Sequence, residues 1–388
     1  MNINQIEPRV QQFVETFLGS SYWGVKLTMI LSLFILVTSF PDYHWYKQNY
    51  PEHIFVKGIN WQIEHPLEPL PESMTALPYG EKTGPSKNLE KRNARILIPL
   101  LGYLLNIEMS GILIIQHFIT LLLLFLIIQM LERILNNRVQ VFYCSLALCS
   151  IFFCKWGFYD PYNFDVFPFF FLVLSMRFKN PFLTYLFVLC AALADERGLL
   201  ASSLVGLWWI FKKDKLSAPI SWELIKNSNF MALCLSWVSY LFLRFIVFQR
   251  IGLASDLSDI GLEPLLHNYK LMPLSLVLNW EGWWIIVAAM IGYMIQMKHY
   301  QFLILYLGLI SLLFLGSFMV YDVSRSLAYS FPALIIALSV LVKFYPPPTL
   351  KILLFRVAMV CLLFPTYGVF FDGVFWLSPI FPKLLKLL

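Results

Sequence analysis

The stretch at residues 112–131, ILIIQHFITLLLLFLIIQML, decides the class of this protein. It is 20 residues long and contains no Asp, Glu, Lys or Arg. A helix needs about 20 consecutive, mostly apolar residues to cross the hydrocarbon core of a bilayer. We therefore predict a transmembrane helix here.

The whole chain has the same character. Of its 388 residues, 59% are hydrophobic and 13% are charged, and the mean hydropathy is +0.69. A soluble domain carries about 25% charged residues. The composition excludes a soluble globular enzyme, a disordered chain and a disulfide-rich secreted domain. It predicts an all-α, polytopic bundle of transmembrane helices.

The apolar runs predict about eleven spans in a single transmembrane domain, residues 22–388, after a cytoplasmic N-terminal segment, residues 1–21. The expected spans cover residues 22–40, 112–131, 139–155, 162–176, 181–194, 198–211, 230–248, 283–297, 302–320, 327–344 and 352–371. Two long extracytoplasmic loops are expected at residues 41–94 and 249–281. Six prolines between residues 51 and 85 exclude a long helix from the first loop.

The apolar run that begins at Arg95 and ends at Leu105 is too short to span a membrane. Lys91 and Arg92 precede it closely. We expect a short helix that lies at the membrane surface. Its cations would contact anionic lipid headgroups or, alternatively, a lipid-linked phosphate.

Lys and Arg concentrate at alternate ends of the spans, which places the N-terminus in the cytoplasm. The cations expected inside include Arg133, Arg138, Arg177, Lys179, Lys212, Lys213, Lys215, Lys226, Lys298, Lys343, Lys351 and Arg356. Those expected in short outer connections are Lys155, Arg197, Arg250 and Lys270, with Arg325 near a span end. A multi-pass protein of a bacterial inner membrane is the expectation.

Most of the 23 acidic residues, Glu281 among them, are expected on or near the outer side. The positive-inside rule does not require this asymmetry, because it concerns cations. An acid-lined polar site at the outer face is therefore predicted. The six cysteines all lie in apolar stretches, which favours buried free thiols over disulfides.

Four acids are the candidates for catalysis. Asp42 lies two residues beyond the first span, beside His44, where it could act as a general base or be an ordinary acid of an interfacial loop. Asp165 lies inside the start of a span, where solvation is difficult. Asp195 and Glu196 belong to the triplet Asp195-Glu196-Arg197, which interrupts an apolar stretch and needs water or partners.

The candidates for substrate binding are other polar residues of the same face. Asp160 could line the site or cap a helix that Pro161 begins. Asp322 and Arg325 are three residues apart, which allows a local ion pair, or Arg325 could hold a phosphate. The full set of substrate-binding candidates is His44, Arg92, Arg95, Asp160, Arg197, Asp322 and Arg325.

The sequence contains no GxGxxG, Walker A, GxSxG or HExxH motif. The spacing of His44, His53 and His65 fits no metal motif. We expect no cofactor and no nucleic-acid partner, and a divalent cation stays open.

The arrangement of the chain resembles that of the GT-C superfamily of integral-membrane glycosyltransferases. The shared features are a long first outer loop, an acid just after the first span and a short interfacial helix behind that loop. The resemblance covers roughly residues 20–210. It implies a polyprenyl-phosphate-linked sugar donor, a glycan, lipid or protein acceptor, and Asp42 as the catalytic acid of the first loop. Asp160 or Asp165 would match a further outer-loop acid, and Arg92, Arg95, Arg197 and Arg325 would face the donor phosphate. The chain lacks a clear Asp-x-Asp in that loop.

Three other functions stay open at this point. A polymerase or ligase of lipid-linked glycans would use similar substrates. A transporter or flippase would need charged groups at mid-depth in the bilayer. A non-catalytic subunit of an envelope polysaccharide complex would tolerate replacement of Asp42 and Asp195.

Overall fold

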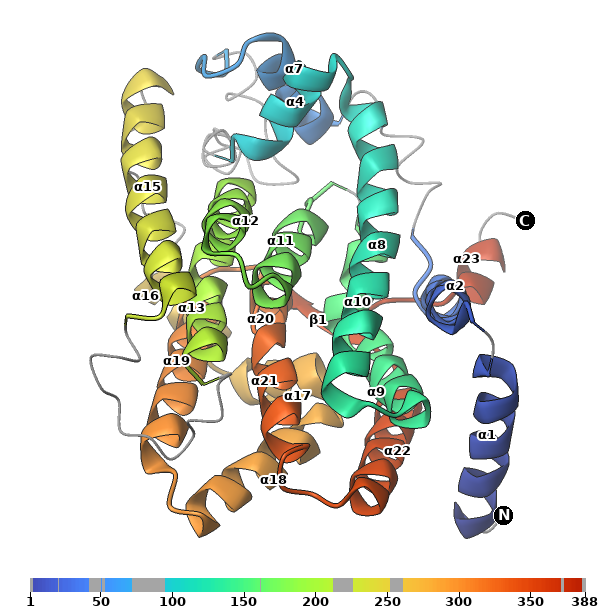
Figure 1. Ribbon diagram of the computed structural model, residues 1–388. Coiled ribbons are helices and arrows are strands. Elements are labelled where there is room, and N and C mark those ends of the chain that lie inside the picture. Colours follow the sequence, from blue (N-terminus) through green and yellow to red (C-terminus); the bar gives the residue numbers. More distant parts are fainter. Residues whose placement is uncertain are drawn as a thin grey trace.

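A computed structural model describes residues 3–19, 21–41, 50, 53–71, 95–160, 162–211, 226–251, 261–370 and 373–385. Within these residues the protein is a helical bundle with one small hairpin (Figure 1). The apolar helices identify an integral membrane protein. Their arrangement brings one set of charged residues together in the interior.

The N-terminal third contains three kinds of helix. α1 (Ile3–Leu18) occupies the segment expected to be polar, and α2 (Trp23–Thr38) is the first strongly apolar helix. α4 (Ile54–Glu64) and α7 (Leu97–Leu105) pack against each other and lie together at one end of the bundle, at the top of Figure 1. The short helix predicted at residues 95–105 is therefore confirmed. α4 lies in the proline-free part of the first loop, between Pro51 and Pro66.

The middle of the chain forms the centre of the bundle. Its helices are α8 (Met109–Leu135), α9 (Arg138–Ser150), α10 (Phe152–Tyr159), α11 (Val166–Arg177), α12 (Pro181–Ala194), α13 (Glu196–Phe211) and α15 (Ser228–Ile251). α8 packs on α2, α9 and α11, and α12 lies between α11 and α15. α8 is about 40 Å long at 1.5 Å per residue, enough to cross the hydrocarbon core.

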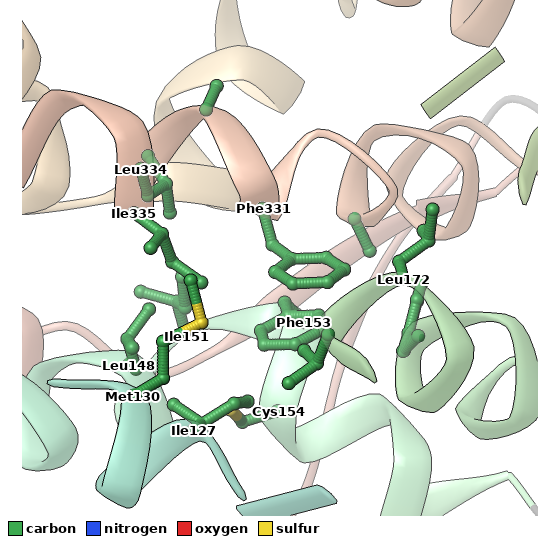
Figure 2. Packing of buried hydrophobic residues seen from close by; sticks show 14 of the residues in the cluster. Ile127, Met130, Leu148, Ile151, Phe153, Cys154, Leu172, Phe331, Leu334 and Ile335 are labelled. Carbon is green, nitrogen blue, oxygen red and sulfur yellow. The ribbon is translucent and has the colours of Figure 1, made fainter. Parts of the chain in front are cut away.

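The C-terminal part completes the bundle. Its elements are α16 (Leu262–Asn268), α17 (Met272–Trp280), α18 (Trp283–Gln296), α19 (Tyr300–Phe318), α20 (Val323–Ala328), α21 (Phe331–Leu341), α22 (Pro347–Leu363), β1 (Tyr367–Phe370), β2 (Gly373–Trp376) and α23 (Ile380–Leu385). α22 packs along α9, and α18 packs on α21. Figure 2 shows the apolar core between α8, α9, α10 and α21, where the rings of Phe153 and Phe331 stack with centroids 4.1 Å apart.

Fewer complete spans are present than expected. Within the described residues, four helical segments are long and apolar enough to cross a membrane: Met109–Leu135, Ser228–Arg250, Tyr300–Phe318 and Val323–Leu341. The count reaches six if two bent pairs, α9 with α10 and α17 with α18, are each one span. α2, α11 and α12 are apolar but only 12 to 16 residues long, which is short of a full crossing. The figure of eleven therefore stays a prediction.

Several expected boundaries were wrong. The span expected at 139–155 is bent by 60° at Ile151, and the loop expected at 249–281 contains α16 and α17, with a bend of 95° between α17 and α18. Lys155 is not in a connection but on α10, where it is buried. The next helix begins at Val166 rather than at Pro161, after Phe164 turns the backbone to a φ of 57°.

The expectation of an all-α protein was also wrong in one place. α22 ends at Leu363 instead of continuing to 371, because Pro365 follows and cannot extend the helix. Beyond it, β1 and β2 form an antiparallel pair in which Phe370 lies opposite Gly373. Aromatic and β-branched residues favour strands, which explains the change of structure in Tyr367-Gly-Val-Phe370.

Gly198 fixes the contact between α12 and α13. A Cβ atom at residue 198 would lie 2.5 Å from the carbonyl oxygen of Ala191, so the two helices could not approach as closely with any other residue. At Gly308, on α19, a Cβ atom would have no neighbour within 4 Å.

We predict that Gly198→Ala destabilises the protein by about 1–3 kcal/mol, since it forces a shift of backbone against backbone. The matched change Gly308→Ala should be neutral or stabilising by up to about 1 kcal/mol, because alanine is the better helix former. Thermal unfolding of the two purified variants in one detergent tests this. Equal melting temperatures would contradict the close packing at Gly198.

Candidate functional site

Seven of the residues predicted from the sequence meet at one place inside the bundle. They come from the segment before α7, from the start of α11, from the α12–α13 junction and from α20 with the residue before it. We call this group the Arg–Asp cluster; it consists of Arg95, Asp165, Asp195, Glu196, Arg197, Asp322 and Arg325. Asp42, His44 and Arg92 lie outside the described residues.

The triplet Asp195-Glu196-Arg197 forms the break between α12 and α13. Asp195 is extended, with φ −158° and ψ 132°, so α12 ends there. Its carboxylate accepts a hydrogen bond from the backbone N–H of Arg197 at 3.0 Å, which satisfies a free donor at the start of α13. The side chains of the triplet are therefore held in place by a helix break.

Asp195 is the partner of three arginines from different segments. Its carboxylate accepts from Nε of Arg197 at 2.8 Å and from Nη2 at 2.6 Å, and Nη1 of Arg95 lies 2.9 Å from Oδ2. Nη2 of Arg325 lies 3.6 Å from the same oxygen. This carboxylate is buried, and its oxygens are occupied by guanidinium groups.

The carboxylate oxygens of Asp165 are likewise occupied by hydrogen-bond donors and guanidinium groups. The indole of Trp156 donates to its carboxylate at 2.9 Å, the hydroxyl of Tyr329 donates at 2.7 Å, and Nη2 of Arg197 lies at 3.3 Å. Nε of Arg325 makes a further ion pair with it. Asp165 stands at the start of α11 without capping that helix through its side chain.

Arg325 is the most enclosed of the three arginines, with a side chain that is 2% exposed. Besides Asp165, it binds Asp322 at 3.1 Å and donates to the backbone carbonyl of Asn163 at 3.3 Å. The local ion pair predicted from the spacing of Asp322 and Arg325 is confirmed. Arg197 also donates to the hydroxyl of Ser326 at 3.1 Å, and its guanidinium lies 4.9 Å from the ring centre of Tyr329.

The cluster is partly accessible at Arg95 and Glu196, as it is at Asp322. Arg95 binds Glu196 through two hydrogen bonds, at 3.1 and 2.8 Å. These two side chains are 20% and 36% exposed, whereas the side chains of Asp165 and Asp195 are almost completely buried. Burial would lower the pKa of the Arg95 guanidinium, but the carboxylates of Asp195 and Glu196 outweigh burial and raise that pKa. Arg95 is therefore a permanent, partly accessible cation.

A small pocket opens beside Arg95, with a cavity volume of about 30 Å³. Its walls come from α4, from α7 and from the segment before α11, and include Gln62, Ile98, Tyr162 and Asn163. Burial, with Tyr50 and Asp160 nearby, raises the pKa of Tyr162 to about 12. The phenol is therefore a hydrogen-bond donor at neutral pH and not a base. The pocket combines apolar walls with one arginine, one phenol and amide groups.

Asp160 has a local structural role next to this pocket. Its carboxylate accepts from the backbone N–H of Tyr162 at 2.9 Å and from the side-chain amide of Asn163. It thus holds the turn that leads into α11.

A second charged pair, which sequence reasoning missed, is buried elsewhere in the bundle. Lys155 and Glu281 are 4% and 8% exposed and lie close enough for mutual electrostatic attraction. Lys155 donates to the hydroxyl of Thr366 at 2.7 Å, and that hydroxyl donates to the carbonyl of Ser150 at 2.7 Å. Neither carboxylate oxygen of Glu281 has a hydrogen-bond partner among the residues that the structure describes.

Each member of this pair lies at a bend between helices. Lys155 follows the 60° bend between α9 and α10, and Glu281 lies within the 95° bend between α17 and α18, with a φ of 46°. The sequence does show that Glu281 is a single charge in an otherwise apolar run, among Trp280, Trp283 and Trp284. Such an isolated charge indicates a functional residue. The sequence pattern did not show that the two charges approach each other.

Within the described residues, no group of three or more His, Cys, Asp or Glu side chains is arranged to hold a metal ion. The expectation of a metal-independent site stays a prediction. No protein family model, no curated protein and no solved structure matches this chain. The resemblance to the GT-C superfamily therefore rests on the arrangement of the chain alone.

We predict that Asp165→Asn costs about 3–5 kcal/mol of stability, because it leaves Arg325 and Arg197 short of a buried counter-charge. The matched change Asp322→Asn removes a carboxylate that is 37% exposed and should cost under about 1 kcal/mol. Denaturant or thermal unfolding in detergent measures both. A loss for Asp165→Asn no larger than that for Asp322→Asn would mean that the buried ion pairs contribute little.

Proposed function

We propose that this protein is an integral-membrane glycosyltransferase that takes a sugar from a polyprenyl-phosphate donor at the extracytoplasmic face. The observation that carries the proposal is the small pocket lined by Arg95, which also belongs to the cluster of three arginines and four carboxylates. Guanidinium groups match phosphate oxygens in geometry and charge. An apolar wall beside such a cation suits a lipid-linked phosphate.

The charges of the cluster determine how a phosphate would bind. Three guanidinium groups and four ionised carboxylates leave one formal negative charge, so a phosphate needs one carboxylate to give way. Glu196 is the candidate, because it is a partly accessible acid bound to Arg95. Asp165 and Asp195 would stay paired and hold Arg197 and Arg325 in position.

The chemistry follows from this exchange. The bond between the sugar and its phosphate breaks while the acceptor hydroxyl forms a bond to the sugar, and the hydroxyl proton passes to a carboxylate. Arg95 would stabilise the negative charge that develops on the polyprenyl phosphate. Asp42 is our proposed base, as the resemblance implies, and the Glu196 carboxylate released from Arg95 is the second candidate. The sugar and the acceptor are not assigned.

We predict that Arg95→Gln lowers glycosyl transfer about 10- to 100-fold, the loss of one or two charge-assisted hydrogen bonds to phosphate. Arg95→Lys should keep part of the activity, because it keeps the charge. Asp42→Asn should abolish transfer. The assay is the glycan and lipid-linked sugar profile of a deletion strain complemented with each variant at equal membrane abundance.

Arg250→Gln is the matched control, since Arg250 is an exposed arginine at the end of α15, at the top of Figure 1 with α4 and α7. It should restore the profile fully. If Arg95→Gln restores it equally well, the phosphate role of Arg95 fails. If Asp42→Asn restores it, Asp42 is not the base.

The buried Lys155–Glu281 pair favours a transporter or flippase as the second candidate function. A Cβ atom at Gly157, on α10, would lie 3.6 Å from the side chain of Thr120. Thr120 is eleven residues beyond the start of α8, which has 27 residues, so α10 lies beside the middle of α8. We infer that Lys155, half a turn away, lies near mid-depth of the bilayer that α8 would cross. Charged groups at that depth are costly and usually functional.

The variant Glu281→Gln separates the two candidates. For a glycosyltransferase, the purified protein in detergent should transfer sugar from a synthetic polyprenyl-phosphate donor, and Glu281→Gln should keep most of that activity. For a transporter, detergent-solubilised protein should show no transfer. In that case Glu281→Gln should fail in the deletion strain while Asp42→Asn complements it.

A further inference from the structure

A second cavity lies at the opposite end of the bundle from α4 and α7. It has a volume of about 210 Å³ and lies between the ends of α8, α13 and α21 and the start of α19. Its walls are mainly apolar and aromatic, and Arg133 and Lys343 are the cations that line it. The apolar wall includes Leu207, Trp208, Phe211, Phe302 and Ile336.

A third cation lies next to this cavity. The indoles of Trp208 and Trp209 donate to the carbonyls of Met176 and Ser175, at 2.9 and 3.0 Å, and so fix the end of α11 against α13. Arg177 is the last residue of α11, and Arg133 is its charged neighbour. Nη1 of Arg177 is buried and has no hydrogen-bond partner within the described part of the chain.

The positive-inside rule does not account for this arrangement. That rule requires cations at the inner ends of spans, where water can solvate them. It does not require two arginines to lie near enough to repel each other, nor a guanidinium nitrogen to be buried without an acceptor among the described residues. A buried donor without a partner costs roughly 1–3 kcal/mol. A ligand oxygen that accepts from it would remove this cost.

We propose that this cavity binds a phosphate-headed lipid, with the phosphate between Arg133 and Arg177 and an acyl chain along the aromatic wall. The cations of the site favour the phosphate headgroup, and its apolar wall favours the acyl chain. The paired guanidinium groups select a phosphate anion, and the apolar wall would be left exposed to water by a free phosphate. The proposal does not depend on the proposed glycosyl transfer, because the two pockets share no lining residue and lie near opposite ends of α13, roughly 24 Å apart.

Native mass spectrometry of the full chain tests the proposal. The protein is reconstituted in nanodiscs of dioleoyl phosphatidylglycerol and phosphatidylcholine in equal amounts, and the lipid that stays bound on release is identified. Retention of phosphatidylglycerol is the expected result. The double variant Arg133→Gln/Arg177→Gln should reduce that retention at least five- to tenfold, the effect of losing one or two charge-assisted contacts.

Two matched variants control for folding and for charge. Arg133→Lys/Arg177→Lys should retain more lipid than the Gln pair, because the positive charge stays. Arg356→Gln removes an exposed arginine from α22, outside the cavity, and should retain as much lipid as the parent protein. Monodisperse elution of every variant on size exclusion shows that the fold is kept.

Three outcomes would overturn the proposal. In the first, phosphatidylcholine is retained as well as phosphatidylglycerol. In the second, the Gln pair and Arg356→Gln retain lipid equally. In the third, inorganic phosphate alone raises the melting temperature of the protein through Arg133 and Arg177 while no lipid is retained, which would make a free anion the ligand.

Discussion

The carboxylate of Asp165 is the group on which the interior of this bundle depends. It accepts from Trp156 on α10, Arg197 on α13, Arg325 on α20 and Tyr329 just beyond it. One side chain therefore joins the start of α11 to three other segments: α10, α13 and α20 with the residue after it. A charge in an apolar interior is tolerated only when its partners surround it. The relative positions of these four segments are consequently coupled through one residue.

Much of the charged site was predictable from the sequence because charge in an apolar run has few structural solutions. Asp195-Glu196-Arg197 had to meet partners or water, and it meets Arg95 and Asp165. The pair of Asp322 and Arg325 follows from helical spacing alone. The enclosing groups were not predictable. Tyr329 reaches Asp165 across 164 residues, and no local pattern carries such a pairing.

The path of the chain was harder to predict than its composition. Hydropathy shows that a segment avoids water, but it does not distinguish a straight span from two short helices at an angle. The bend at Ile151 therefore turned an expected span into α9 and α10, and it moved Lys155 from an expected connection into the interior. Glu281 was expected in an outer loop, which stays a prediction, and the structure places it at a second break between apolar helices.

The Arg–Asp cluster and the Lys155–Glu281 pair are held by neighbouring residues of the same segments. Any proposed function must therefore be compatible with both. Lys155 and Trp156 are consecutive on α10, and the first faces Thr366 while the second donates to Asp165. Tyr329 and Ser330 are also consecutive, and Ser330 accepts from the indole of Trp280, beside Glu281. A ligand that releases Glu196 from Arg95 changes the charge balance of the Arg–Asp cluster. Because α10 and the α20–α21 turn contact both groups, a displacement there would reach Glu281 as well. A transferase would need these supports to stay rigid during the reaction, whereas a transporter would need them to move.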